Sequence, residues 1–276
     1  MSYPPGFGRN LAFRVATALV ALPLLLAAFF KGPVWLGVAI VALALLAGLF
    51  EFFGLLRARG LRPLRLTGLL LAAAMFADVA APGLLAIPLW PLCALLLLAV
   101  TLGPGRALED TVPAAAMTLL GAIYLGALGG TIAALHLLPP PGAGPWRILL
   151  LLAIVMASDT LAFFVGHALG RHRLAPRVSP GKTVEGALGG IVGGIVGALA
   201  VRAYGMPALP LVDALTLGAC VAGAGIVGDL DESLLKRWAG VKDSGTLFPG
   251  HGGALDRLDG LLFGAPILYY YFLVAR

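Results

Sequence analysis

Apolar segments of about 20 residues, almost free of charge, recur along this whole chain and limit what it can fold into. A helix of about 20 residues spans a hydrocarbon layer of about 30 Å. We therefore expect an all-α, polytopic integral membrane protein with about nine transmembrane helices. The nine segments lie approximately at residues 11–30, 34–56, 66–85, 87–102, 113–137, 146–168, 184–204, 209–230 and 258–275.

The composition supports a membrane location. Of the 276 residues, 60% are hydrophobic and only 12% are charged, which is too few to build a water-soluble surface. The first segment has the length of a signal peptide, but no clear small-residue cleavage site follows it and a second segment comes at once, so we expect a retained helix. The two cysteines, Cys93 and Cys220, fall in or near predicted spans, so no disulfide framework is indicated and each is expected to be a buried small hydrophobe.

The distribution of Lys and Arg predicts the orientation, because short cytoplasmic loops carry an excess of both residues. With the N-terminus placed in the cytoplasm, all Lys and Arg residues except Lys31, Arg147, Arg202 and Arg276 fall on the cytoplasmic side. The same side receives the two longest polar loops, 169–183 and 231–257. We expect a multi-pass protein of the cell inner (cytoplasmic) membrane whose active-site loops face the cytoplasm. The net charge of +6 then reflects topology and anion binding, and no nucleic acid partner is expected.

Acidic residues concentrate in the second half of the chain, where most of them lie between positions 159 and 259. We therefore divide one integrated membrane domain into an amino-terminal transmembrane scaffold, residues 1–145, and a carboxy-terminal catalytic transmembrane region, residues 146–276. Within the latter, glycines repeat every four residues on two adjacent tracks of the segment 184–204. Such spacing predicts a face where helix backbones pack closely in lipid.

The sequence "DRLD" places Asp256 and Asp259 three residues apart, so both carboxylates share one face if a helix begins near Leu255. Two adjacent anions at a membrane need a compensating cation, and Mg²⁺ prefers oxygen ligands. The alternative is a surface network in which Arg257 and Lys242 neutralise the two aspartates. The spacing alone favours neither interpretation.

Upstream, "GDLDESLLKR" places Asp229, Ser233, Lys236 and Arg237 along one side of a helix. A carboxylate, a hydroxyl and two cations on one stripe suit a metal-bound polyphosphate. The alternative is a helix end whose cations extend toward lipid headgroups, which is a common arrangement.

The other long loop contains "RVSPGKTVEG", which is not a Walker A loop because Pro176 stands where the first glycine is required. Ser179, Lys182, Thr183 and Glu185 remain at the N-terminus of the next span, where a helix can receive an anion.

Two further features carry polar groups. In "PGHGG", the glycines around His251 let backbone N–H groups face an anion, although, taken alone, a plain turn is the better account of them. Asp159 is an ionisable group inside the segment 146–168 and is a functional candidate for that reason, with an interhelical hydrogen bond as the alternative.

Taken together, these motifs resemble those of a known family. The stretch "SLLKRWAGVKDSGTLFPGHGGALDRLDG", residues 233–260, is similar to the signature of the phosphatidate cytidylyltransferases, also called CDP-diacylglycerol synthases, at every fixed position of S-x-x-K-R-x4-K-D-x5-P-G-H-G-G-x-x-D-R-x-D. The stretches "SPGKTVEGALGG" and "SDTLAFFVGHALG" also resemble the family, which more often has a lysine where Gly181 stands. The specific resemblance covers about residues 155–275, and the first half matches only as generic spans.

The resemblance implies a membrane enzyme of phospholipid biosynthesis, often a homodimer, that joins phosphatidic acid to CTP and forms CDP-diacylglycerol and pyrophosphate. It implies Mg²⁺ held by Asp229, Asp256 and Asp259, with K⁺ as a second cation nearby. The implied catalytic residues are Asp229, Ser233, Lys236, Arg237, Lys242, Asp243, Asp256 and Asp259. The implied substrate-binding residues are Ser179, Lys182, Thr183, Glu185, His251, Gly252, Gly253 and Arg257.

Two other classes fit the sequence less well. A transporter would explain the many spans and Asp159, but not the gathering of polar groups in loops and at helix ends. CDP-alcohol phosphotransferases also handle CDP-lipids, but their D-G-x2-A-R-x8-G-x3-D-x3-D pattern is absent from this sequence. Acyl-chain preference and the choice between CTP and dCTP are not encoded in any recognisable motif.

Overall fold

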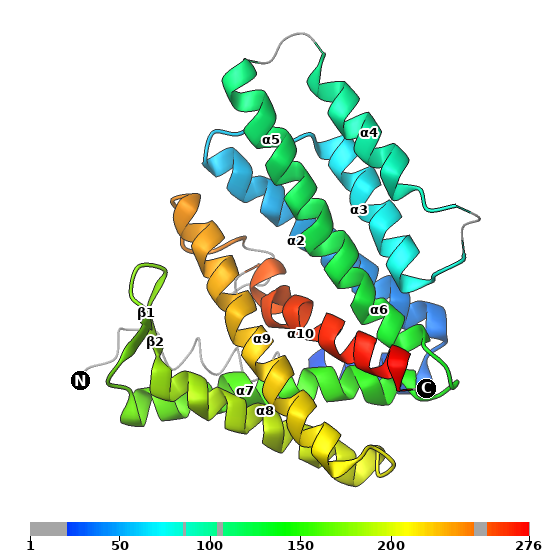
Figure 1. Cartoon of the computed structure of the whole chain (residues 1–276), viewed down its shortest axis with the longest axis vertical. Coiled ribbons are helices and arrows are strands. Elements are labelled where there is room, and N and C mark those ends of the chain that lie inside the picture. Colours follow the sequence, from blue (N-terminus) through cyan, green and yellow to red (C-terminus); the bar gives the residue numbers. More distant parts are fainter. Residues whose placement is uncertain (1–20, 85–86, 104–106, 246–252, 276) are drawn as a thin grey trace.

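A computed structural model describes residues 21–84, 87–103, 107–245 and 253–275. It is almost entirely helical, as expected (Figure 1). In chain order, the elements are a first helix Ala21–Lys31, α2 Val34–Ala58, α3 Arg65–Ala80, α4 Trp90–Thr101, α5 Leu108–Gly121, the π-helix η1 Ala122–Leu128, α6 Gly129–Leu137, α7 Gly144–Leu169, β1 Arg173–Ala175, β2 Ser179–Thr183, α8 Val184–Gly205, α9 Leu211–Trp238 and α10 Leu255–Val274.

Five helices in the described part of the chain are long and apolar enough to cross a membrane. They are α2, the continuous helix Glu109–Leu137 that joins α5, η1 and α6, and then α7, α8 and α9. By helix composition the protein is therefore a multi-pass membrane protein. The expected count of nine transmembrane helices is wrong.

The physical reason is that an apolar run in the sequence includes residues that fold as turns. The helices α3 and α4 contain only 16 and 12 residues, short of the 20 or so that cross a bilayer. The helix α10 has 20 residues, but three of its first five are charged. Of the first predicted segment, only the helix Ala21–Lys31 lies among the described residues.

The helix α10 occupies the centre of the fold. It contacts α2, α6, α7 and α9, and it lies between α9 and α6 in Figure 1. Its residues Leu255, Leu262 and Leu268 are fully buried. Polar groups in its first turns are therefore placed among helices from both halves of the chain.

The glycine tracks of α8 pack as predicted. A Cβ atom on Gly193 would collide with the carbonyl oxygen of Ala157 in α7, and one on Gly194 would lie 2.6 Å from the carbonyl oxygen of Gly218 in α9. Only glycine lets the three backbones approach this closely, which confirms the predicted contact face.

The polar loop before α8 folds as a small antiparallel hairpin, β1–β2, in which Arg173 pairs with Thr183. The sequence pattern does not predict these strands. Thr183 caps α8, since its side chain accepts the N–H of Gly186 at 3.1 Å. The cap fixes the hairpin at the N-terminus of α8.

The helix α9 ends in a turn that reverses the chain toward α10. Gly240 has a φ of +76°, which favours glycine, and the N–H of Val241 donates to the carbonyl oxygen of Lys236 at 3.0 Å. The basic residues Lys236 and Arg237 therefore stand in the last turn of α9.

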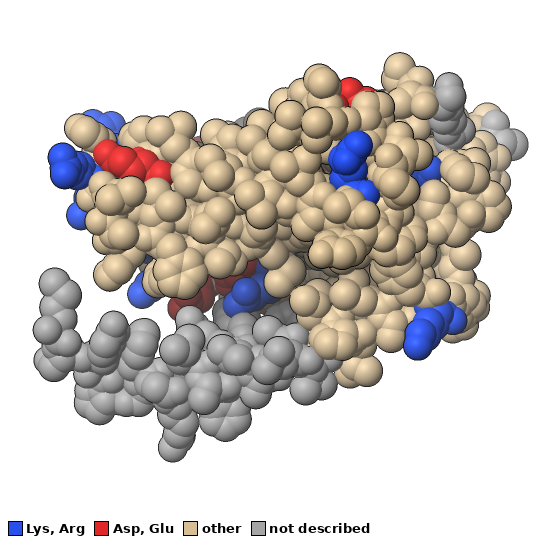
Figure 2. Space-filling view, turned by 90° about the horizontal axis from the view of Figure 1, so that it is seen from below, with Lys and Arg blue, Asp and Glu red and all other residues tan. Residues whose placement is uncertain are grey.

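The surface in Figure 2 is mostly uncharged, as expected of a protein embedded in lipid.

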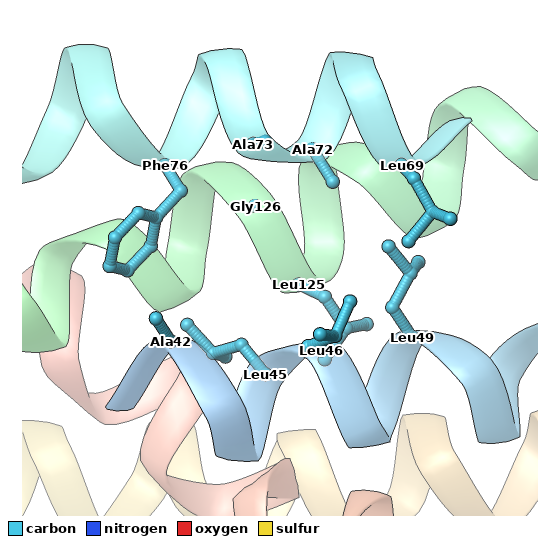
Figure 3. Close-up of a pocket in the computed structure, with 10 residues that line it drawn as sticks. All are labelled: Ala42, Leu45, Leu46, Leu49, Leu69, Ala72, Ala73, Phe76, Leu125 and Gly126. Atoms are coloured by element: carbon cyan, nitrogen blue, oxygen red, sulfur yellow. The ribbon is translucent and has the colours of Figure 1, made fainter. Parts of the chain in front are cut away.

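An apolar cavity of about 230 Å³ lies between α2, α3 and η1, lined by residues such as Leu45, Phe76 and Leu125 (Figure 3). Cys93 and Cys220 form no disulfide, but Cys93 is only half-buried and Cys220 is exposed, so the expected burial of both is wrong.

Candidate active site

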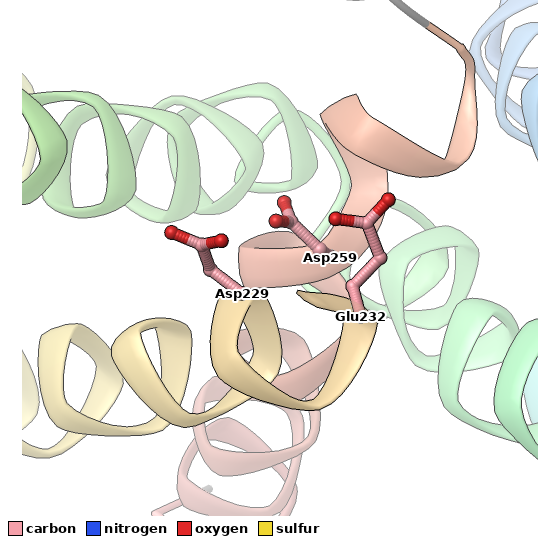
Figure 4. A group of neighbouring side chains, drawn as sticks. All are labelled: Asp229, Glu232 and Asp259. Carbon is pink, nitrogen blue, oxygen red and sulfur yellow. The ribbon is translucent and has the colours of Figure 1, made fainter. Parts of the chain in front are cut away.

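Three carboxylates meet where α9 crosses α10. Asp229 and Glu232 from α9 and Asp259 from α10 point toward one another, and each offers an oxygen within 4.8 Å of the others (Figure 4). The two helices approach closely here because a Cβ atom on Gly228 would collide with the carbonyl oxygen of Asp259. We call these three residues the acidic cluster.

The acidic cluster contains a buried oxygen without a hydrogen-bond partner. Glu232 is 1% exposed, and its Oε1 finds no donor among the described residues. Buried polar atoms in folded proteins are almost always paired, so this oxygen is open to a further partner. A divalent cation held by oxygen ligands would satisfy it.

Lys236 connects the acidic cluster to the first turn of α10. Its Nζ lies 2.6 Å from Oε2 of Glu232 and 2.5 Å from Oδ1 of Asp256. Asp256 thus pairs with a lysine, whereas Asp259 joins the acidic cluster. The two aspartates of "DRLD" both face α9, as their spacing predicts, but they have different partners.

The β-hairpin contributes to the same region. Lys182 of β2 forms an ion pair with Asp229, and the Nε of Arg237 donates to the carbonyl oxygen of Val178 at 3.4 Å. A cavity of about 570 Å³ lies between α7, α8, α9 and the hairpin, and Asp159, Lys182 and Asp229 line it. The two polar loops therefore meet in space, although about 50 residues separate Lys182 from Asp229 in the sequence.

Other predicted site residues lie at the edges of this region. Glu185 accepts the backbone N–H of Arg171 at 3.0 Å and lies 2.6 Å from the Nδ1 of His172, so it holds the start of the hairpin. Ser179 and Ser233 are half-buried, Gly253 and Thr183 are buried, and Lys242, Asp243 and Arg257 are exposed. His251 and Gly252 lie outside the described residues.

Two acidic residues near the site have no role assigned from the sequence. Glu232 lies three residues after Asp229 and four before Lys236, and this helical spacing was a usable signal. Glu51 of α2 accepts backbone N–H groups at the start of α10. Nothing in the sequence links it to a helix about 200 residues away.

Residues 12–275 match the Cytidylyltransferase family. The chain belongs to this family. The match confirms the family that residues 233–260 predict. Among curated relatives, a protein of Synechocystis sp. named phosphatidate cytidylyltransferase is 34% identical over 94% of this chain and 95% of its own length.

Other members of the cytidylyltransferase family are similar over shorter regions. A phosphatidate cytidylyltransferase of Haemophilus influenzae is 38% identical over 50% of each chain. One of Bacillus subtilis is 41% identical over 42% of this chain and 44% of its own length. The chain thus spans about half the length of these two relatives and nearly all of the Synechocystis protein.

Proposed function

We propose that this protein transfers the cytidylyl group of CTP to phosphatidic acid, forming CDP-diacylglycerol and pyrophosphate in phospholipid biosynthesis. The similarity along 94% of the chain to a protein named phosphatidate cytidylyltransferase carries this proposal. The site adds a chemical reason, because the acidic cluster lies beside two lysines, Lys236 of α9 and Lys182 of β2.

In the proposed reaction, a phosphate oxygen of the lipid attacks the α-phosphorus of CTP. The bond from that phosphorus to the oxygen bridging to the β-phosphate breaks, and pyrophosphate leaves with the bonding electrons. The attacking oxygen is already an anion, so no strong general base is needed. The protein must instead bring two anions together and align them.

The acidic cluster fits a Mg²⁺ ion. Asp229, Glu232 and Asp259 offer carboxylate oxygens within 4.8 Å of one another, and Oε1 of Glu232 is buried with no hydrogen-bond partner among the described residues. When bound, Mg²⁺ supplies positive charge against the phosphate oxygens. We keep Asp256 as a further expected ligand from the family signature, with K⁺ as a second cation nearby.

The basic residues would neutralise the phosphates. We assign phosphate contacts to Lys236, Arg237 and Lys242 near the end of α9, and to Lys182 on the hairpin. Ser233, Ser179 and Thr183 would add hydroxyl groups, and Asp243 would orient a neighbouring cation. Lys182 and Lys236 already lie beside carboxylates of the site, so both cations are held there before nucleotide arrives.

The remaining substrate-binding assignments follow the signature. Gly252 and Gly253 would present backbone N–H groups to the nucleotide, with His251 and Arg257 beside them. Glu185 would act through the hairpin that it holds.

We further propose that the site faces the cytoplasm, where soluble CTP is found, and that the protein works as a homodimer. An excess of Lys and Arg near the hairpin and the end of α9 supports this orientation.

The decisive experiment incubates purified protein in phosphatidate-containing vesicles with Mg²⁺ and CTP. We expect pyrophosphate release matched by CDP-diacylglycerol formation, and neither product without phosphatidate. Ion flux across the vesicle membrane without turnover would support a transporter instead and would overturn the proposed activity.

A further inference from the structure

The start of α10 is capped by a side chain from another helix. The residue before this helix is Ala254, which has no side-chain acceptor. Glu51 of α2 takes its place, since Oε1 accepts the N–H of Ala254 at 3.0 Å and Oε2 accepts the N–H of Leu255 at 2.9 Å. A carboxylate at this position satisfies N–H groups that an uncapped helix leaves unpaired, and it interacts favourably with the helix dipole.

The same carboxylate is joined to the proposed site. The hydroxyl of Ser244 lies 3.1 Å from Oε2 of Glu51 and 3.0 Å from Oδ2 of Asp256, so its proton can be donated to either. Asp256 also accepts the N–H of Gly253 at 2.7 Å and pairs with Lys236. Contacts therefore run without a break from Glu51 to the acidic cluster.

The backbone is shaped to fit this carboxylate. A Cβ atom on Gly245 or on Gly253 would collide with the side chain of Glu51. Ser244 and Gly245 approach it from the segment after α9, and Gly253 and Ala254 approach it from the residues just before α10. Glu51 thus fixes where the chain enters α10, and with it Asp256 and Asp259 in the next turn.

We propose that Glu51 is a positioning residue for the cytidylyl transfer. It acts through α10, by holding Asp256 beside Lys236 and Asp259 in the acidic cluster. This inference rests on the proposed function, because it assumes that these groups form the reactive site. It assigns a direct task to a residue of the half of the chain that the sequence predicts to be only scaffold.

The test compares Glu51→Gln with Tyr271→Phe in the full-length protein. Glutamine keeps the size of the side chain but turns an NH₂ group toward backbone donors and removes the charge. Tyr271→Phe removes the hydrogen bond of 2.5 Å from the tyrosine to Asp213, which ties the far end of α10 to α9. It is a matched control for weakened attachment of α10 away from the site.

We expect Glu51→Gln to lower kcat for pyrophosphate release about a hundredfold, since small misplacements of reacting groups have effects of this size. Both variants should lower Tm, by similar amounts. Tyr271→Phe should nevertheless leave kcat within about twofold of wild type. Glu51→Asp should recover about tenfold over Glu51→Gln, because the charge and both acceptors return on a shorter side chain. Equal kcat in Glu51→Gln and wild type, or a loss in Tyr271→Phe as large as that in Glu51→Gln, would overturn the inference.

Binding of Mn²⁺, followed by electron paramagnetic resonance, gives a readout without turnover. Carboxylate sites for Mg²⁺ also accept Mn²⁺. The Kd for Mn²⁺ should rise about tenfold in Glu51→Gln and stay unchanged in Tyr271→Phe. An unchanged Kd in Glu51→Gln would contradict a positioning role. If wild type releases no pyrophosphate, the proposed activity is wrong. The Mn²⁺ titration still tests whether Glu51 positions the carboxylates of the acidic cluster.

If Glu51→Gln aggregates, Ser244→Ala tests the positioning role of Glu51 instead. This variant breaks the link from Glu51 to Asp256 but keeps the backbone cap of α10. We expect about a tenfold lower kcat and a weaker affinity for Mn²⁺. Wild-type values for both would overturn the inference.

Discussion

Lys236 links α9 to α10 through its ion pair with Asp256, in which the lysine Nζ lies 2.5 Å from Oδ1 of the aspartate. The same Nζ lies 2.6 Å from Oε2 of the buried Glu232. One ammonium group is therefore shared by two carboxylates at the crossing of the helices. Breaking such a buried arrangement by removing one partner leaves the remaining charges uncompensated.

Replacing Lys236 by alanine should affect both stability and substrate use. We expect the free energy of unfolding to fall by about 3 kcal/mol, because two little-exposed carboxylates lose their partner. The KM for CTP should rise, since a phosphate-neutralising cation is gone. Thermal unfolding and a CTP titration check both effects, with Lys31→Ala at an exposed helix end as the control. An unchanged CTP titration would count against a phosphate role for Lys236.

Removing an acid of the acidic cluster should raise the Mg²⁺ requirement. For Asp229→Asn and Glu232→Gln, we expect the Mg²⁺ concentration at half-maximal rate to increase about tenfold or more, because each change removes an anionic oxygen ligand. Chelation by EDTA should abolish turnover, and added Mg²⁺ should restore it. Asp213→Asn, at the opposite end of α9, is the control. Normal Mg²⁺ titrations in both variants would exclude the cluster as the metal site.

The two aspartates of "DRLD" can be separated by mutation. Asp259 lies in the acidic cluster and Asp256 pairs with Lys236, so their amide variants should differ. We expect Asp259→Asn to shift the Mg²⁺ titration more than Asp256→Asn does. Asp256→Asn should also raise the KM for CTP, because Lys236 loses a partner that holds it in place. Equal Mg²⁺ shifts with an unchanged KM in Asp256→Asn would contradict this division of roles.

The packing of α7 on α8 predicts opposite effects for two glycine substitutions. Gly193→Ala should destabilise the protein by about 1 to 3 kcal/mol, because the new methyl group meets the Ala157 carbonyl oxygen. Gly223→Ala in α9 should be neutral or stabilising, since no neighbouring helix among the described residues comes within 4 Å of the place that its methyl group would take. Thermal unfolding in detergent measures both. Equal stability of the two variants would contradict the close packing.

The parts of the site that follow helical spacing could be predicted from sequence. Asp229 and Lys236 share α9, and α10 begins at Leu255, as the pattern around "DRLD" indicates. The glycine contact face of α8 was likewise predictable, because small residues every four positions have one main use in lipid.

The rest depends on information that no local pattern holds. Apolar runs do not reveal where a helix stops, so the sequence predicts spans at α3 and α4 although both helices are too short. The hairpin β1–β2 has strands of three and five residues, too short for a period-two signal. In the sequence, Glu51 is an ordinary acid near the end of a span, because its contacts with α10 exist only after the two halves have packed.

The cap on α10 has a consequence for how such a protein can diverge. Most positions of the amino-terminal helices need only be apolar and of suitable volume, so substitutions there have little effect. One acid in α2 is an exception, since moving it by a single residue would swing it about 100° around the helix. A chimaera whose first half comes from an unrelated helical bundle must therefore place a carboxylate where Glu51 lies. Without it, we expect the second half to fold with a misplaced active site.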